Sequence, residues 1–214
     1  MSTTTSFLVL FAVLAVTMIP SCVGFQSNIV PRPTKLTSMY SSMDEMFNKN
    51  EDLLLVRQTL EEKYSGFSRL LNLNDSVWKS IGAGYINGFT LFVPTNAALE
   101  SLDETKQAQL LDERNLETIQ KMVSYHVISE LVTADDLFNA GGVITLGGEV
   151  AVDRSTSGGM FGVGGKEDGG VLVNQSKVVQ SVPLGSGIVH EVDGLVSPNI
   201  MWRYMDQLRI PGSK

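Results

Sequence analysis

The chain contains two histidines, the residue type best suited to binding a metal or moving a proton near neutral pH. His190 opens the string HEVDG, which begins like the HExxH motif of zinc enzymes. Gly194 stands where that motif needs its second histidine, and the apolar alternation around His190 predicts a strand, not a helix. No cluster of metal-ligand residues accompanies either histidine. We therefore predict no metal site and a buried, structural role for His190.

Other strings resemble catalytic or ligand-binding motifs but lack a required residue. Met160–Lys166 would be a phosphate-binding loop only with glycine at position 160 and serine or threonine in place of Glu167. The stretch from Asp153 begins like a calcium loop, yet Gly164 stands where the bidentate acid belongs. We therefore expect no enzymatic activity.

Composition narrows the classes of partner. The 214 residues include 16 Lys and Arg against 23 Asp and Glu, which gives a net charge of -7, and basic residues form no cluster. Such a chain repels phosphate backbones, so nucleic acid is excluded as a partner. Cys22 is the one cysteine of the sequence, which excludes a disulfide scaffold. With 43% hydrophobic and 18% charged residues, we expect one folded domain with appendages.

The N-terminal 43 residues have the composition of targeting segments. Phe7–Ile19 is almost wholly apolar but shorter than the roughly 20 residues of a membrane-spanning helix, so residues 1–24 are expected to be a signal peptide. Residues 25–43 are rich in serine and threonine and contain no acid, which is typical of a transit peptide but also suits a flexible linker. Together, residues 1–24 and 25–43 resemble the two-part presequences of secondary-plastid algae. The mature chain should have no transmembrane span.

Beyond residue 43 the apolar pattern has the period of helices first and of strands later. Helices are expected over 53–64 and 67–73, separated at Ser65–Gly66 and both facing the core, and over 75–83. Phe89–Val93 reads as a buried strand, and later helices should pass through residues 116–123 and start at Thr133.

The second half alternates apolar and polar residues. Gly147–Gly148 is expected to be the turn of a hairpin between strands 143–146 and 150–152. Three more strands are expected over 171–173, 178–182 and 188–192. The glycine-rich stretch Ser155–Gly170 should be a mobile hairpin tip.

Five strings together resemble a fasciclin (FAS1) domain over about residues 52–198: FTLFVPTNAAL from Phe89, SYHVI from Ser124, ITLGGEVAV from Ile144, VLVNQSKVV from Val171 and GIVHEVDGLVSP from Gly187. The resemblance implies an α+β fold in which a wedge of β-strands packs against a cluster of short α-helices. It also implies a non-catalytic role in adhesion and in association with proteins or polysaccharides. Some algal members are linked to binding apolar pigments.

Six residues of these strings are expected to define the fold. Thr95 is a good N-cap, and Asn96 can bond loop backbone that would otherwise stay unpaired. The full set is Phe89, Pro94, Thr95, Asn96, His190 and Asp193.

The pair Tyr125–His126 is the first interaction candidate. In the family this pair is tied to both core structure and adhesion, and we favour structure. No string like NKDIL or EPDIM occurs, so integrin-type recognition is not expected.

Two further features carry binding hypotheses. Asn74 and Asn174 lie in N-glycosylation sequons, which matter only if the chain passes through the secretory lumen. Residues 199–214 form an amphipathic extension, which either packs on its own domain or presents a contact surface to a partner or a membrane. Its interaction candidates are Met201, Trp202, Tyr204 and Met205.

The sequence thus predicts a fasciclin domain at residues 44–198 that acts as a non-enzymatic interaction module. The favoured setting is an algal plastid, with a protein partner such as a photosynthetic membrane complex in the thylakoid. One alternative is a secreted, cell-surface adhesion protein that binds matrix or polysaccharide. Another is a carrier of an apolar ligand such as a carotenoid, and no other cofactor is expected.

Overall fold

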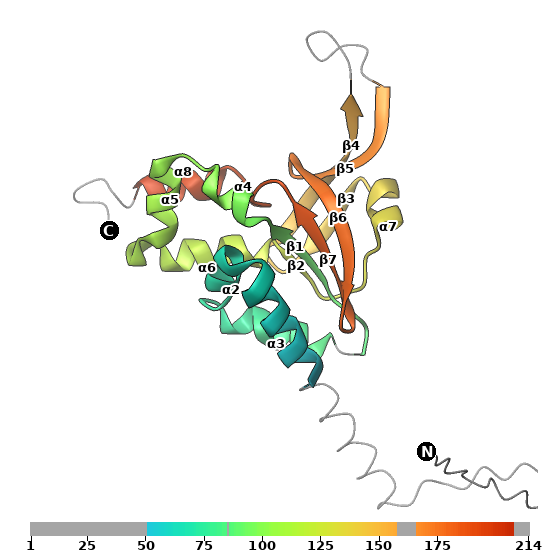
Figure 1. Cartoon of the computed structure of the whole chain (residues 1–214). Coiled ribbons are helices and arrows are strands. Elements are labelled where there is room, and N and C mark those ends of the chain that lie inside the picture. Colours follow the sequence, from blue (N-terminus) through green and yellow to red (C-terminus); the bar gives the residue numbers. More distant parts are fainter. Residues whose placement is uncertain (1–50, 85, 158–165, 208–214) are drawn as a thin grey trace, which may run out of the picture.

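The computed structural model describes residues 51–84, 86–157 and 166–207, so the expected signal peptide and residues 25–43 lie outside the described part of the chain. Most of the short helices gather on one side of a seven-stranded sheet, whereas the helix at residues 134–139 packs against the strands at 148–157 and 166–173 (Figure 1). This is the α+β arrangement that the resemblance implied, so the fold prediction is confirmed. None of the described helices is long and apolar enough to cross a bilayer.

The first helices begin close to where the apolar periodicity placed them. Residues 51–63 are helical, and the break falls at Tyr64 instead of Ser65–Gly66. After it come α2 (Ser65–Leu71) and α3 (Asp75–Ala83). Two leucines expected in the core are exposed instead: Leu54, in the first helix, and Leu73, which lies in the turn after α2.

The remaining helices are short. In chain order they are α4 (Asn96–Glu100), α5 (Glu104–Leu111), the 3-10 turn η1 (Glu113–Asn115), α6 (Leu116–Ser124), α7 (Ala134–Asn139) and α8 (Ile200–Gln207).

Side-chain caps fix where several of these helices begin. Asn74 accepts the backbone N–H of Ser76 at 3.1 Å and starts α3, which settles the choice that the sequence left open between Asn74 and Asp75. Thr95 accepts the N–H of Ala98 at 3.1 Å and starts α4, as the sequence predicted. Thr133 starts α7 through a reciprocal capping box, which the sequence also predicted.

The sheet has the strand order β2-β1-β7-β6-β5-β4-β3. Neighbouring strands are antiparallel except for β1 and β7, which run parallel with Thr90 opposite Ile188 and Pro94 opposite Val192. The strands are β1 (Thr90–Pro94), β2 (Val127–Ile128), β3 (Gly142–Thr145), β4 (Gly148–Ser157), β5 (Lys166–Val173), β6 (Ser176–Leu184) and β7 (Gly187–Val192).

Two predictions in the strand half need correction. The turn between β3 and β4 consists of Leu146 and Gly147, because Thr145 pairs with Gly148. β4 and β5 also extend into the stretch expected to be a loose tip, and Ser155 is buried there. Only residues 158–165 of that stretch lie outside the described chain, and the paired strands project from the body as a ribbon (Figure 1).

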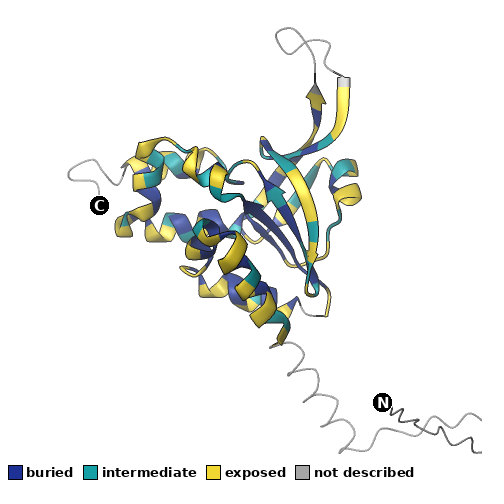
Figure 2. Cartoon of the chain, in the orientation of Figure 1, coloured by how far each residue is buried: buried dark blue, intermediate teal, exposed yellow. Residues whose placement is uncertain are grey.

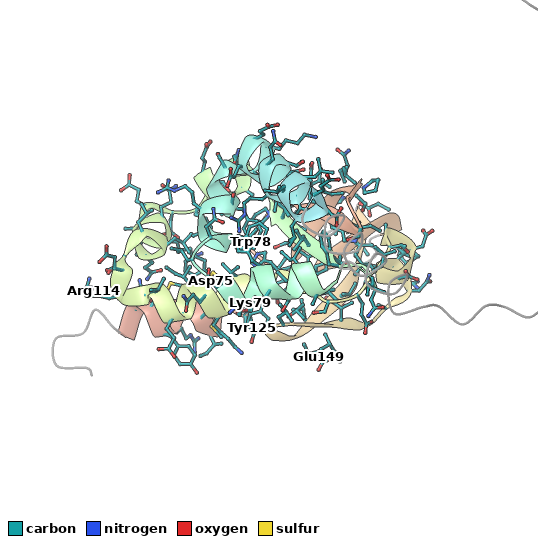
Figure 3. The ribbon with its side chains drawn as sticks, turned by 90° about the horizontal axis from the view of Figure 1, so that it is seen from below. Asp75, Trp78, Lys79, Arg114, Tyr125 and Glu149 are labelled. Carbon is teal, nitrogen blue, oxygen red and sulfur yellow. The ribbon has the colours of Figure 1, made fainter. Side chains whose placement is uncertain are left out.

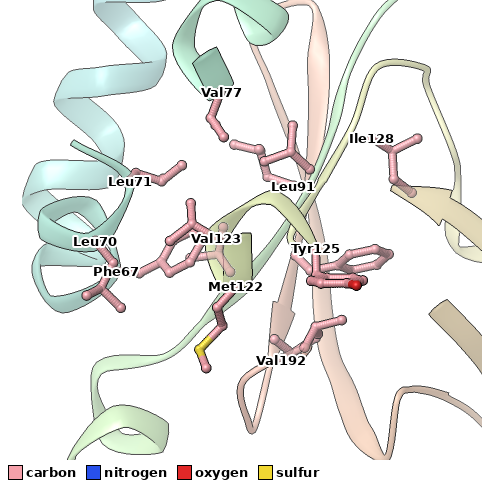
Figure 4. Close-up of a cluster of buried hydrophobic side chains, with 14 of the residues drawn as sticks. Phe67, Leu70, Leu71, Val77, Leu91, Met122, Val123, Tyr125, Ile128 and Val192 are labelled. Carbon is pink, nitrogen blue, oxygen red and sulfur yellow. The ribbon is translucent and has the colours of Figure 1, made fainter. Parts of the chain in front are cut away.

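The core lies between the helices and the central strands. Figure 2 shows β1 and β2 buried along their length, while the helices bury only their inner faces. In Figure 4 the side chains of α2 and α6 point toward those of the strands. Fully or nearly fully buried members of this cluster include Phe67, Leu71, Leu91, Met122, Val123 and Val192.

Candidate functional site

The predicted interaction residues lie just after the end of α6 and along α8. His126 follows α6 directly and has none of its surface exposed. Its Nδ1 lies 3.0 Å from the carbonyl oxygen of Met122, and its Nε2 lies 3.0 Å from the backbone nitrogen of Val196. Because a carbonyl only accepts and a backbone N–H only donates, the ring is neutral, with its proton on Nδ1.

This environment opposes protonation of His126. Burial lowers the pKa of the imidazole from 6.5 to about 4, and the hydrogen bond to the Met122 carbonyl offsets only part of that effect. The ring also packs against Phe67 of α2, with 5.0 Å between the ring centroids. His126 therefore ties α6, α2 and the C-terminal segment together, and no part of it reaches the surface.

Tyr125 is buried beside it, against the turn between β3 and β4. A Cβ atom at Gly147 would lie 2.6 Å from Tyr125 Cγ, so the close packing requires glycine there. The ammonium of Lys121 lies 5.8 Å from the centre of the tyrosine ring. Figure 3 places Tyr125 between α6 and the strand that carries Glu149.

The four interaction candidates of α8 separate into buried and exposed residues. Met201 and Met205 are buried in the core cluster, so α8 packs on its own domain. Trp202 is partly buried, with the ammonium of Lys106 5.4 Å from its ring centre. Tyr204 keeps 47% of its surface exposed. It is thus the candidate most accessible to another molecule.

A groove of about 600 Å³ lies between the start of α3, the outer side of α6 and α8. Its lining is mixed: hydroxyl, amide, carboxylate and ammonium groups, a thioether and an aromatic ring. The residues are Asn74, Ser76, Glu117, Thr118, Gln120, Lys121, Ser124, Met201 and Tyr204. We refer to this surface as the α6–α8 groove.

His190, the other histidine, is also fully buried and fully bonded. Its Nε2 donates to the Val132 carbonyl at 2.9 Å, so its Nδ1 accepts the Ser181 hydroxyl at 2.7 Å. Burial lowers the pKa of the ring, and the Phe92 ring stacks on it with centroids 5.7 Å apart. The environment is the satisfied structural one that the alternating strand predicted.

The other fold-defining residues join elements that are distant in sequence. Asn96 accepts the Gly66 N–H at 3.1 Å and donates to the Lys63 carbonyl at 3.2 Å, which joins α4 to the start of α2. Asp193 accepts the Lys177 N–H at 2.6 Å, while its own N–H donates to the Lys177 carbonyl at 3.1 Å.

Phe89 and Pro94 stand at the two ends of β1. Phe89 is buried where a Cβ at Gly187 would lie 2.5 Å from its ring, so the start of β7 approaches the ring closely. Pro94 is the last residue of β1, one residue beyond the strand end that the sequence predicted, and the Thr95 N–H then donates to the Val192 carbonyl at 3.1 Å.

Both sequon asparagines use their side-chain amide nitrogen, the atom that glycosylation would modify. Asn74 is buried and donates to the Gln120 carbonyl at 2.9 Å. Asn174 donates to the Ser197 carbonyl at 2.6 Å. Asn174 and Gln175 also form the left-handed turn between β5 and β6, with φ of 47° and 72°.

One hollow was missed by sequence reasoning. It has a volume of about 290 Å³ and is lined by Leu53, Leu54, Arg57 and Trp78. The Arg57 guanidinium lies 4.5 Å from the centre of the Trp78 ring. The helical pattern placed Leu54 in the core, so nothing in the sequence pointed to an exposed site. Across the described ranges, no group of three or more His, Cys, Asp and Glu side chains could hold a metal ion.

Comparison with known proteins adds three findings. The model of a family described as Fasciclin domain matches residues 62–198. Protein sll1483 of Synechocystis sp. is 32% identical over 111 residues, which cover 51% of this chain and 55% of that protein. Stabilin-1 of Mus musculus is 29% identical over 111 residues, 51% of this chain but 4% of that much longer protein.

Among solved structures, a FAS1 domain pair from the insect cell adhesion molecule Fasciclin I matches with a TM-score of 0.46 and 19% identity. The match covers 63% of this chain and 45% of that one. The chain therefore spans about half the length of the cyanobacterial relative and a small part of the stabilin.

Proposed function

The chain belongs to the fasciclin domain family, and on that basis we propose that it is a non-enzymatic module that binds another protein through the α6–α8 groove. The favoured partner belongs to a photosynthetic membrane complex in an algal plastid. The presequence-like residues 1–43 support this setting.

The observation that carries the proposal is Tyr204, exposed on a helix that is itself anchored in the core. Met201 and Met205 fix α8, so the tyrosine ring is presented at one wall of the groove with little conformational freedom to lose. Tyrosine on a rigid support is a typical anchor of protein interfaces. Glu117 and Lys121 on the opposite wall supply charges of both signs, which suit a polar interface rim.

The state of the histidines supports a non-enzymatic role. General acid or base catalysis needs a ring nitrogen that can reach a substrate. Both nitrogens of His126 and of His190 are already hydrogen-bonded inside the fold, and burial lowers the pKa of each ring. Neither ring is exposed.

A photo-crosslinking amino acid at position 204 of the full chain tests the groove. The labelled protein is incubated with membranes and with the extracellular fraction of its source cells, then irradiated. A matched control carries the crosslinker at position 144, where the side chain is 80% exposed on β3, outside the groove lining. We expect a discrete protein adduct from position 204 and none from position 144. Equal adducts from both positions, or none from position 204, would refute the groove as the contact surface.

The same experiment separates the two settings. An adduct formed only with membranes supports the plastid complex, whereas one formed only with the extracellular fraction supports the secreted adhesion alternative. The intact mass and the N-terminal sequence of the protein from its source cells give an independent test of secretion against plastid import. A start near residue 25 with added hexose supports secretion, and an unmodified start near residues 39–44 supports plastid import.

Carotenoid carriage is a separate proposal that rests on the family alone. It predicts visible absorbance in the protein purified from its source cells, and a colourless protein would contradict it.

A further inference from the structure

Two side chains hold the segment that leads into α8 by hydrogen bonds: the Asn174 amide, which donates to the Ser197 carbonyl at 2.6 Å, and the His126 imidazole. His126 Nε2 accepts the backbone N–H of Val196, four residues before α8 begins. The same ring is anchored to α6 by its other nitrogen, through the Met122 carbonyl. The bond to Val196 therefore exists only while His126 is neutral, because a protonated ring would direct a second N–H at the N–H of Val196.

The contacts between α8 and the domain leave polar groups unpaired. Ser197 Oγ, at the approach to α8, is buried and makes no hydrogen bond within the described residues. Gln109 Oε1 on α5 is also buried and makes no hydrogen bond within the described residues, although the amide nitrogen of Gln109 donates to Asp206 of α8. Unpaired buried polar atoms oppose burial. Detaching α8 would return both atoms to water, which favours local opening of this contact; the third such atom of the described residues, Ser68 Oγ, lies on α2.

We propose that His126 is a proton-sensitive latch: its protonation breaks the bond to Val196, loosens the segment that Asn174 still contacts at Ser197, and detaches α8 while the rest of the domain stays folded. The Met201–Met205 face of α8 and the part of α6 that it covers then become accessible. This inference goes beyond the proposed function, because it concerns how the fold exposes a surface and holds whatever the groove binds.

Charged side chains around the ring do not account for this behaviour. The pKa of His126 is set by burial and by the Met122 carbonyl. The charged groups on the surrounding elements are exposed or bonded to other residues. The exposed ones are Arg69 on α2, Glu117 and Lys121 on α6, and Arg203 on α8. Glu191 on β7 accepts the Tyr64 hydroxyl, Asp193 after β7 accepts the Lys177 N–H, and Asp206 on α8 accepts the Gln109 amide.

The size of the effect follows from the two states of the ring. In the closed state the pKa of the ring is about 4, and detachment of α8 raises it toward the ordinary value of 6.5, which is the upper limit because the ring keeps its contacts with Phe67 and the Met122 carbonyl. Acidification across that window therefore shifts the equilibrium between closed and open α8 by up to about 300-fold toward the open form.

Trp202 on α8 reports this opening. In the full chain with Trp78→Phe, Trp202 is the only tryptophan, and iodide quenching measures its accessibility. We expect quenching to rise as the pH falls from 7.5 toward 4, while far-UV circular dichroism loses only the contribution of the eight-residue α8. The His126→Gln variant should show no such rise, and the His190→Gln variant should keep it.

Hydrogen exchange on the protein without substitutions tests the same proposal and does not depend on any variant folding correctly. After correction for the intrinsic pH dependence of exchange, amides of residues 196–207 should lose protection at a higher pH than those of β1 and β7. Loss of protection in all these segments at the same pH would overturn the latch. So would an acid-induced rise in quenching that persists in a folded His126→Gln protein.

Discussion

Replacing Gly147 with alanine tests whether the close packing of Tyr125 holds the end of α6 against the sheet. An added Cβ would lie 2.6 Å from Cγ of that tyrosine and 2.7 Å from its backbone nitrogen. The ring atom could retreat by a side-chain rotation, but the nitrogen belongs to the chain that closes α6. We therefore expect the backbone of the turn or of α6 to move.

The magnitude follows from the cost of overpacking a well-filled interior. One extra methyl group in such a site costs about 1–3 kcal/mol. We expect a value near the upper end, about 3 kcal/mol, because one of the two opposing atoms is main chain. The helix-to-strand hydrogen bond between Gly147 N and the Ser124 carbonyl, 2.9 Å long, should weaken with it.

Urea unfolding followed by circular dichroism measures this loss, and Gly141 offers a matched control. A Cβ at Gly141 meets no atom within 4 Å, so Gly141→Ala should change the free energy of unfolding by less than about 0.5 kcal/mol. Equal stabilities of the two alanine variants would refute the packing argument. In a Tyr125→Ala background, Gly147→Ala should cost less than in the parent protein but still destabilise, because the contact with the backbone nitrogen remains.

Three further predictions concern hydrogen-bonded side chains. The free energy of unfolding should fall by up to about 3 kcal/mol as the pH is lowered from 6.5 to 4, because His126 takes up a proton more readily in the unfolded chain than in the folded one. The midpoint of urea unfolding should therefore depend less on pH in His126→Gln than in the parent protein. Asn96→Ala should cost about 1–3 kcal/mol, since it leaves the Gly66 N–H and the Lys63 carbonyl without this partner; thermal unfolding that matches the parent would contradict the bridge. Peptide mapping of the source protein should find no glycan on Asn74, whose amide nitrogen is buried and bonded, and a glycan there would contradict the geometry of the α3 cap.

Local sequence predicted those features of this fold that local chemistry determines. Thr95 and Thr133 cap helices through contacts within three residues of themselves, so they could be identified without knowing the rest of the chain. The same holds for Asn74. The histidine strand was predictable because period-two alternation around His190 already indicated burial.

Features that depend on distant segments were out of reach of the same reasoning. Leu54 matches the helical pattern, but which side of the helix is covered depends on α3. The one-residue shift of the β3–β4 turn is set by packing of Gly147 on Tyr125, which no nearby residue reveals. For the same reason, the accessibility of Tyr204 beside two buried methionines could not be read from an amphipathic stripe alone.

The parallel pairing of β1 with β7 determines how late in synthesis the domain can fold. Thr90 and Ile188 are partners although about 100 residues separate them, so the centre of the sheet cannot form until nearly the whole chain is available. During synthesis, a nascent chain that ends before residue 187 lacks the strand against which both β1 and β6 align. If residues 1–43 direct the chain through a membrane during synthesis, the domain stays unfolded, and so able to pass through a translocation channel, until its final strand emerges. Folding is then completed on the far side of that membrane.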